Sequence, residues 1–135
     1  MPASHRIDRE QGVVLSRLWG TLTTAEIEEH RRSIRDDPSF APHFRYIVDM
    51  RGVTVLDYSC ARVRHVAATQ HFRGGQRRAI VAAADEAYGM ARMFATFAAL
   101  EGEVVEVFRE WIDAVAWLGV SGELAQDPGL AAAVD

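Results

Sequence analysis

The sequence predicts a single α/β domain in which a sheet carries helices, and three observations lead to that class. Short apolar runs of strand length alternate with helical patterns along residues 46–118. Two further strand-like stretches near the start are separated by a turn signal. The chain has 135 residues, of which 49% are hydrophobic and 25% charged, the balance of one ordinary globular domain.

The first two strands form an expected N-terminal β-hairpin over residues 7–10 and 13–19. Apolar and β-branched residues in both stretches flank a Gln-Gly pair that suits a tight turn. A first helix should follow Thr23, because Thr23 and Glu26 have the spacing of a capping box. Few residues of this helix are apolar, so we expect it to lie on the surface and to end at the Asp-Asp-Pro of residues 36–38.

The remaining elements form parallel β-α units and bring the total to about four helices. Strands are expected at 46–50, 79–83 and 104–108, and helices at 59–72, 86–100 and 110–118. Asp49 should close the first of these strands. Alternation of strands with helices requires parallel pairing through right-handed crossovers, with the hairpin at one edge. The domain should span residues 1–119, and residues 120–135, polar and then alanine-rich, should form a loosely ordered tail.

Composition excludes several classes of protein. The formal net charge of −4 offers no cationic field for nucleic acid or an anionic membrane surface. Cys60 is the single cysteine, which excludes an intramolecular disulfide and a multi-cysteine zinc site. The longest apolar run, residues 79–84, is far shorter than the ~20 residues of a membrane span, and a cytoplasmic protein is expected. His65 and His71 lack metal-ligand spacing, so neither a metal nor a cofactor is expected.

Residues 49–60 read Asp-Met-Arg-Gly-Val-Thr-Val-Leu-Asp-Tyr-Ser-Cys, which resembles the strand-loop-helix signature of STAS domains, the fold of bacterial anti-sigma-factor antagonists such as SpoIIAA. By this resemblance Asp49 ends the strand, Asp57 is the second aspartate of the motif, and Ser59 corresponds to its phosphorylatable serine. Tyr58 and Cys60 depart from the pattern, where they replace a hydroxyl residue and a glycine.

Three later segments, 88–94, 107–110 and 114–118, look like an uncharacterised SpoIIAA-like bacterial family that is grouped with STAS and CRAL-TRIO folds. The resemblance covers residues 5–119 and implies a single-domain SpoIIAA-like (STAS-type) sheet. It implies a fold more firmly than an activity.

Ser59 has two readings. A phosphate on a hydroxyl at a helix N-terminus would meet unpaired backbone amides, and Arg62, one turn further, would offset repulsion by Asp57. The alternative is that Asp57 or Ser59 simply caps the helix. Cys60, in the first turn, is either a thiol activated by the helix dipole or a small buried hydrophobe.

The third helix is apolar nearly all round, because Arg92 is its single charged residue between positions 87 and 100. Met90, Phe94 and Phe97 follow i, i+4, i+7 spacing, and Met93 lies on an adjacent stripe. Such side chains need a cover, since each would forgo about 1.5–3 kcal/mol in water.

Three covers for this helix are open. The first is the sheet together with Trp111 or Trp117, and the second is another copy of the chain in a symmetric dimer. The third is an apolar ligand in a cleft lined by methionine and phenylalanine.

The leading functional hypothesis is a non-enzymatic regulatory domain that binds a protein partner through residues 49–59 and the start of the following helix. The alternative is a carrier or sensor of a small apolar molecule or lipid, based on the third helix and on the kinship with CRAL-TRIO folds. An enzyme that uses Cys60 comes third.

Overall fold

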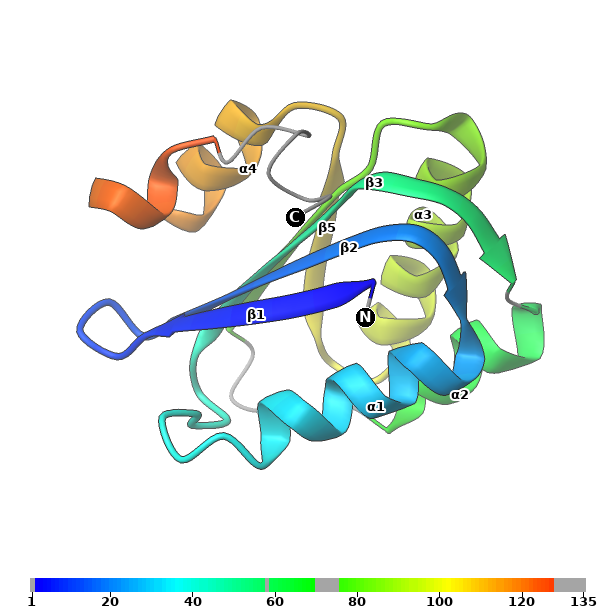
Figure 1. The fold of residues 1–135 in the computed structure, drawn as a ribbon, viewed down its shortest axis with the longest axis horizontal. Coiled ribbons are helices and arrows are strands. Elements are labelled where there is room, and N and C mark those ends of the chain that lie inside the picture. Colours follow the sequence, from blue (N-terminus) through cyan, green and yellow to red (C-terminus); the bar gives the residue numbers. More distant parts are fainter. Residues whose placement is uncertain (1, 58, 70–75, 128–135) are drawn as a thin grey trace.

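A computed structural model describes residues 2–57, 59–69 and 76–127. It contains one five-stranded sheet in the order β1-β2-β3-β4-β5, so that every strand lies beside the next one in the chain (Figure 1). β1 and β2 are antiparallel, and the other three pairs are parallel. This is the predicted α/β sheet with its hairpin at one edge.

The strands are Ala3–Asp8 (β1), Val13–Thr23 (β2), Arg45–Asp57 (β3), Arg77–Val81 (β4) and Val104–Phe108 (β5). The helices are Thr24–Arg35 (α1), Cys60–Ala68 (α2), Asp85–Leu100 (α3), Trp111–Leu118 (α4) and the short 3-10 helix Gly122–Ala125 (η1).

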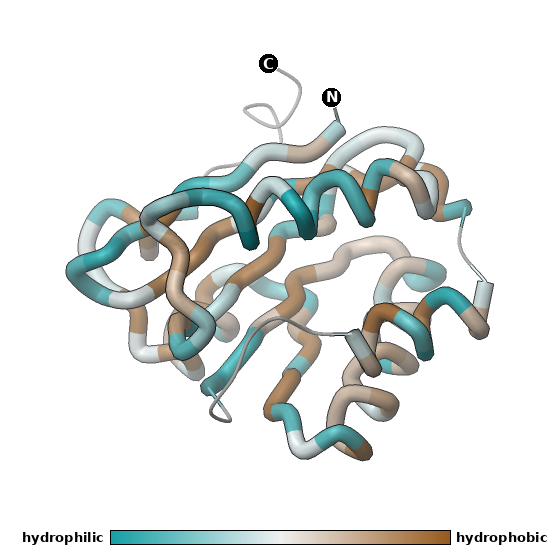
Figure 2. The backbone as a smooth tube through the Cα atoms, turned by 90° about the horizontal axis from the view of Figure 1, so that it is seen from below, coloured by the Kyte–Doolittle hydropathy of each residue, from teal (hydrophilic) through white to brown (hydrophobic). Residues whose placement is uncertain are grey.

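The helices divide between the two faces of the sheet. α1, α2 and α3 cover one face, and α4 lies on the opposite face (Figure 1). Because strand side chains alternate, Val48 faces the three-helix side, whereas Ile47 packs with Trp111 under α4. In Figure 2 the brown segments of the strands lie inside the molecule, and α1 is mainly teal. The hydrophilic colour of α1 agrees with its predicted surface position. Two residues of α1, His30 and Ile34, are buried.

Local signals fix the ends of two helices as predicted. The Thr23 side-chain oxygen accepts a hydrogen bond from the Glu26 backbone N–H, and the Thr23 backbone N–H donates one to the Glu26 carboxylate, which completes the capping box. α4 ends where Gly119 adopts the left-handed conformation with φ of 72°, which a residue with a side chain rarely adopts.

The prediction that Asp49 ends a strand is wrong, because β3 continues to Asp57. β2 is also longer than predicted and reaches Thr23, and its last residues pair with β3 from Gly52 onward. β4 stops opposite Asp49, so the last part of β3 has β2 as its neighbour within the sheet. The expected interaction loop of residues 49–59 is therefore mostly strand.

The packed part of the chain extends beyond the expected end at residue 119. Val120 and Leu124 are buried in the core under α4. The indole N–H of Trp111 donates to the carbonyl oxygen of Ala125 at 2.9 Å, and Gln11 hydrogen-bonds both backbone groups of Ser121. The expectation of a loose tail thus fails for residues 120–127, and the rest of the tail lies outside the described residues.

Candidate functional site: a cavity under three helices

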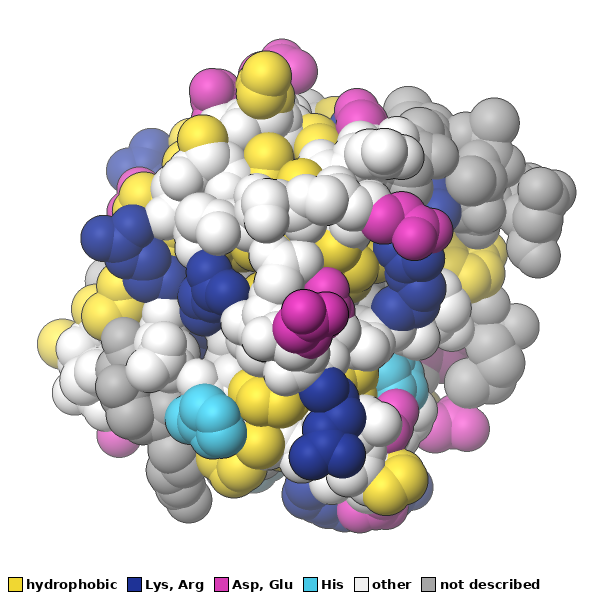
Figure 3. Space-filling model, turned by 90° about the vertical axis from the view of Figure 1, so that its left-hand side faces the viewer, with side chains coloured by type: hydrophobic (Ala, Val, Ile, Leu, Met, Phe, Trp, Pro, Cys, Tyr) yellow, Lys and Arg dark blue, Asp and Glu magenta, His cyan; other side chains and the backbone are white. Residues whose placement is uncertain are grey.

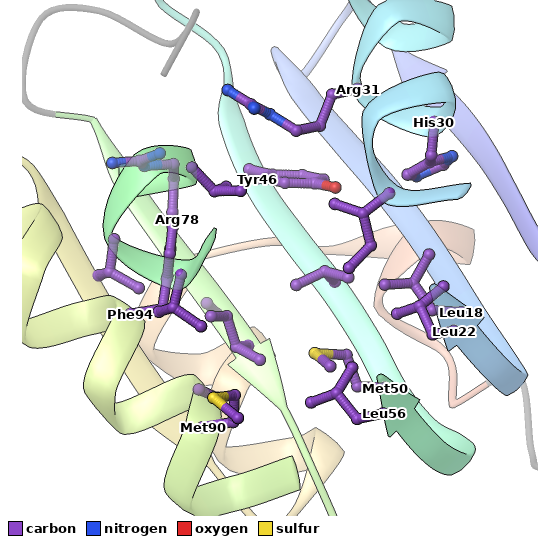
Figure 4. Close-up of a pocket in the computed structure, with 18 of the residues that line it drawn as sticks. Leu18, Leu22, His30, Arg31, Tyr46, Met50, Leu56, Arg78, Met90 and Phe94 are labelled. Carbon is purple, nitrogen blue, oxygen red and sulfur yellow. The ribbon is translucent and has the colours of Figure 1, made fainter. Parts of the chain in front are cut away.

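A cavity of about 140 Å³ lies between the sheet and helices α1, α2 and α3, and it is partly open to solvent (Figure 4). The strands contribute alternate residues that face the three-helix side, such as Leu18, Val48 and Met50. Each helix contributes one or more of the remaining side chains, including Ile27 from α1 and Val63 from α2. The lining is almost entirely apolar, so the cavity suits an apolar molecule.

The apolar stripe predicted on α3 divides between two environments. Met90 and Phe94 line the cavity, whereas Met93 and Phe97 are partly buried outside it. The Arg64 guanidinium of α2 lies 5.6 Å from the centre of the Phe97 ring. α2 therefore covers part of this stripe.

The predicted cover by tryptophan is wrong. Trp111 and Trp117 pack on the opposite face of the sheet, because α4 crosses to that face after β5. At the end of α3, Leu100 remains 77% exposed. Cover by a second copy stays a prediction.

A short chain of hydrogen bonds joins two residues of the cavity wall, His30 and Tyr46, through Ser16. The Tyr46 hydroxyl donates to the Ser16 oxygen at 2.7 Å, and the His30 Nε2 lies 2.8 Å from the same oxygen. Burial, together with the nearby His5, lowers the pKa of His30 to about 4, and burial raises the pKa of Tyr46 to about 12. Both side chains are thus neutral near pH 7.

Two arginines also line the cavity. Arg78 on β4 has a side chain that is 3% exposed and pairs with Glu103 at 3.3 Å. Arg31 on α1 pairs with Glu28 at 3.2 Å and donates to the backbone carbonyl of Thr69 at the end of α2. In Figure 4 both guanidinium groups and the Tyr46 ring lie toward one end of the cavity, whereas Met50, Leu56 and Met90 lie toward the other end.

The strand residues and arginines of this site were missed by sequence reasoning. Tyr46, Val48 and Met50 alternate with Ile47 and Asp49 along β3. This period-2 pattern was a usable signal for which side chains share a face with α3. Arg78 gave no signal, because a charged residue next to an apolar run is usually assigned to the surface.

Asp49 is buried and forms hydrogen bonds with a neighbouring arginine. Its side chain is 3% exposed and accepts hydrogen bonds from the Arg51 Nε at 2.9 Å and Nη2 at 3.0 Å. Arg51 also pairs with Asp127 and lies over the Trp111 ring. Asp49 is therefore buried on the α4 side of the sheet, and its role in binding a partner stays a prediction.

The other predicted switch residues are exposed around the start of α2. Ser59 is the N-cap, and its oxygen accepts the Arg62 backbone N–H at 3.2 Å. Asp57 ends β3, and the Cys60 thiol is free and exposed, which excludes the reading of Cys60 as a buried hydrophobe. Tyr58 lies outside the described residues.

Two kinds of feature are absent from the described part of the chain. No group of three or more His, Cys, Asp or Glu side chains there could hold a metal ion. Among the helices of residues 2–57, 59–69 and 76–127, none has the length and apolar character needed to cross a membrane. On the face that Figure 3 shows, positive and negative side chains are interspersed.

Comparison with known proteins bears on the fold. The sequence matches no family model and no curated protein. One similar solved structure is that of an uncharacterized protein of the DUF3478 family from Shewanella loihica PV-4, described as having a SpoIIAA-like fold. The two structures superpose with a TM-score of 0.60 at 16% sequence identity, over 86% of this chain and 93% of that one. The expected architecture is confirmed: this chain has a SpoIIAA-like fold.

Proposed function

We propose that this protein binds a small apolar molecule in the cavity under α1, α2 and α3. The observation that carries the proposal is a cavity of about 140 Å³ with an almost wholly apolar lining. An engineered apolar cavity of about 150 Å³ in another protein binds benzene, so the volume suits one ring or a short branched chain. A bound apolar molecule would remove the apolar lining of the cavity from water, which favours binding.

The first test of the proposal places a larger side chain in the cavity wall, so that it occupies the space for the ligand. Ala91 on α3 lines the cavity, whereas Ala99 on the same helix is exposed and lies outside it. We expect Ala91→Met to weaken toluene binding at least tenfold, because the longer side chain takes the volume that the ring needs. Ala99→Met should leave the affinity unchanged. Chemical-shift titration measures both, and equal affinities in the two variants would refute the cavity as the site.

Native mass spectrometry of the freshly purified protein adds a second readout. A non-covalent adduct that disappears on denaturation would give the mass of a retained ligand. The same adduct should be weaker on the Ala91→Met variant. An adduct of undiminished intensity on that variant would locate the ligand elsewhere.

A second candidate function is a regulatory domain that recognises a protein partner and is switched by phosphorylation of Ser59. The supporting observation is an exposed Ser59 hydroxyl at the N-terminus of α2, beside Asp57 and Arg62. Phosphoryl transfer from ATP by a kinase would place an anion near the backbone N–H groups of the first turn. α2 also contributes Val63 and Val66 to the cavity wall. A phosphate on Ser59 that shifts α2 would therefore also change the shape of the cavity.

Substitution at Ser59 separates capping from switching. Ser59→Ala should lower the free energy of unfolding by about 1 kcal/mol through loss of the cap, whereas Ser59→Asp should keep it, since aspartate caps equally well. Thermal unfolding measures this difference. The switch further predicts a phosphate on Ser59 in protein isolated from its native cells, and different partner binding by the two variants. Identical partner binding would leave Ser59 with the capping role alone.

A further inference from the structure

β5 forms one edge of the sheet, and no described strand pairs with its outer side. Such an edge offers backbone N–H and C=O groups to another strand, and proteins usually protect it with charged side chains. The opposite edge, β1, carries the charged side chains of Arg6 and Asp8. β5 reads Val-Val-Glu-Val-Phe, so Glu106 is its one charged residue. The β5 edge is therefore the more open of the two to a further strand.

The side chains along the α4 side of this edge are apolar around one carboxylate. Val104 and Phe108 face the α4 side with Glu106 between them, because strand side chains alternate. Val104 is 41% exposed, and the Phe108 ring packs against Trp117 with 5.7 Å between the ring centroids. An added strand thus meets an apolar group, a carboxylate and a second apolar group in succession.

On the other side of the edge, α3 leaves room for an added strand. Arg109 directly follows β5, and its guanidinium lies 4.0 Å from the centre of the Tyr88 ring, so this flank of α3 faces the β5 edge. Ala95 and Ala99 lie on the same flank, about two and three turns further along the helix. Their short side chains leave space for the side chains of a neighbouring strand.

The charge around β5 is negative. Residues 100–113 contain five carboxylates and one arginine. Glu101, Glu106 and Glu110 are exposed, and none of them forms an ion pair with a described residue. A strand with a basic residue opposite Glu106 therefore suits this edge. A second copy suits it poorly, because the antiparallel register that pairs all five residues of two β5 strands places two Glu106 side chains opposite each other.

We propose that β5 binds an extended segment of another protein as a sixth strand, with a basic residue of that segment opposite Glu106. Main-chain hydrogen bonds hold such an added strand, and its alternate side chains give specificity. Apolar residues two positions before and after the basic one lie beside Val104 and Phe108. The residues directly next to the basic one face α3 and lie near Ala95 and Ala99. This inference does not depend on a ligand in the cavity.

The test titrates capped synthetic peptides into the full chain and follows binding by calorimetry. The peptide Lys-Val-Val-Lys-Val-Phe-Lys places a lysine opposite Glu106, and its control Lys-Val-Val-Glu-Val-Phe-Lys places a glutamate there. We expect the first to bind about tenfold more tightly, since opposite charges attract across a strand pair and like charges repel. Replacing the two consecutive valines of the first peptide with prolines removes at least one N–H that faces β5, and it should abolish binding.

Charge reversal on the protein shows whether Glu106 is the carboxylate that the peptide meets. Glu106→Lys should reverse the preference, so that the peptide with the central glutamate binds more tightly. The matched control is Glu29→Lys, because Glu29 is exposed on α1 and makes the same change of charge far from β5. This control should keep the original preference. Bound peptide should also slow hydrogen exchange of the β5 amides.

Each contrary outcome removes a defined part of the proposal. Equal affinities of the unmodified chain for the lysine and glutamate peptides would overturn the basic partner. A peptide that binds without slowing exchange in β5 lies elsewhere, and the edge is then not the site. A dimer of the chain alone in which the β5 amides are protected would mean that a second copy covers this edge. Failure of the lysine peptide to bind at millimolar concentration would refute the docking strand itself.

Discussion

Replacing Asp49 with alanine is expected to lower the free energy of unfolding by about 3–5 kcal/mol, because it removes one partner of a buried ion pair and leaves a cation behind. Asp49 is 3% exposed and holds the Arg51 guanidinium through two of its nitrogens, and the Arg17 Nε lies 3.9 Å from the same carboxylate. Hydrogen bonds to Asp49 and Asp127 raise the pKa of Arg51, so the side chain stays charged. Chemical denaturation measures the loss.

Two controls show whether the buried pair is the cause. Asp127 is the second carboxylate that pairs with Arg51, and its side chain is 50% exposed. Asp127→Ala should therefore lower the free energy of unfolding by less than about 1 kcal/mol. The double variant Asp49→Ala, Arg51→Met should regain part of the loss, because no buried cation remains. An Asp49→Ala variant as stable as Asp127→Ala would contradict this account.

Acidification is expected to destabilise the protein through His30 by about 3 kcal/mol. The pKa of His30 falls from 6.5 to about 4 on folding, and each unit of pKa shift corresponds to about 1.4 kcal/mol. Between these values the unfolded state binds the proton and the folded state does not, so stability rises with pH across this window. The contribution is fully present above about pH 6.5 and is lost as the pH falls through about 4.

Unfolding free energies measured at intervals from pH 7.5 to 4 test this expectation. His30→Gln should flatten the profile over that window. The pKa values of the Asp8 and Asp37 carboxylates are lowered by hydrogen bonds from the Gln11 and Ser39 backbone N–H groups, so these carboxylates affect stability only below about pH 5, and the part of the profile between pH 6.5 and 5 reports on His30. A wild-type profile that is flat between pH 6.5 and 4 would mean that His30 is solvated.

Most of the fold is predictable from the sequence because its signals are local. The apolar runs at β4 and β5, the capping box at Thr23 and the glycine after α4 each fix an element from neighbouring residues. The second half of β3 is not predictable in this way. Gly52 and Asp57 disfavour a strand, and the strand conformation of this stretch is stabilised by pairing with the end of β2, far away in sequence.

The candidate site is predictable in part for the same reason. Helical spacing identified Met90 and Phe94, which do line the cavity, but it also selected Phe97, which does not. Helical spacing shows which residues of α3 share one face. The position of α2 in the folded protein decides which of these residues α2 covers and which line the cavity. The buried cation Arg78 depends on Glu103, a pairing that only the assembled sheet creates.

The separation of the helices between two faces has a consequence for synthesis on the ribosome. All five strands and the three helices of one face precede α4 in the chain, so that face can be completed during translation. The opposite face, with Leu15, Ile47 and Val81, waits for α4 and for residues 120–127. A chain stalled or cleaved shortly after Phe108 would present this apolar surface to water and to other nascent chains, and we expect such fragments to aggregate or to recruit chaperones.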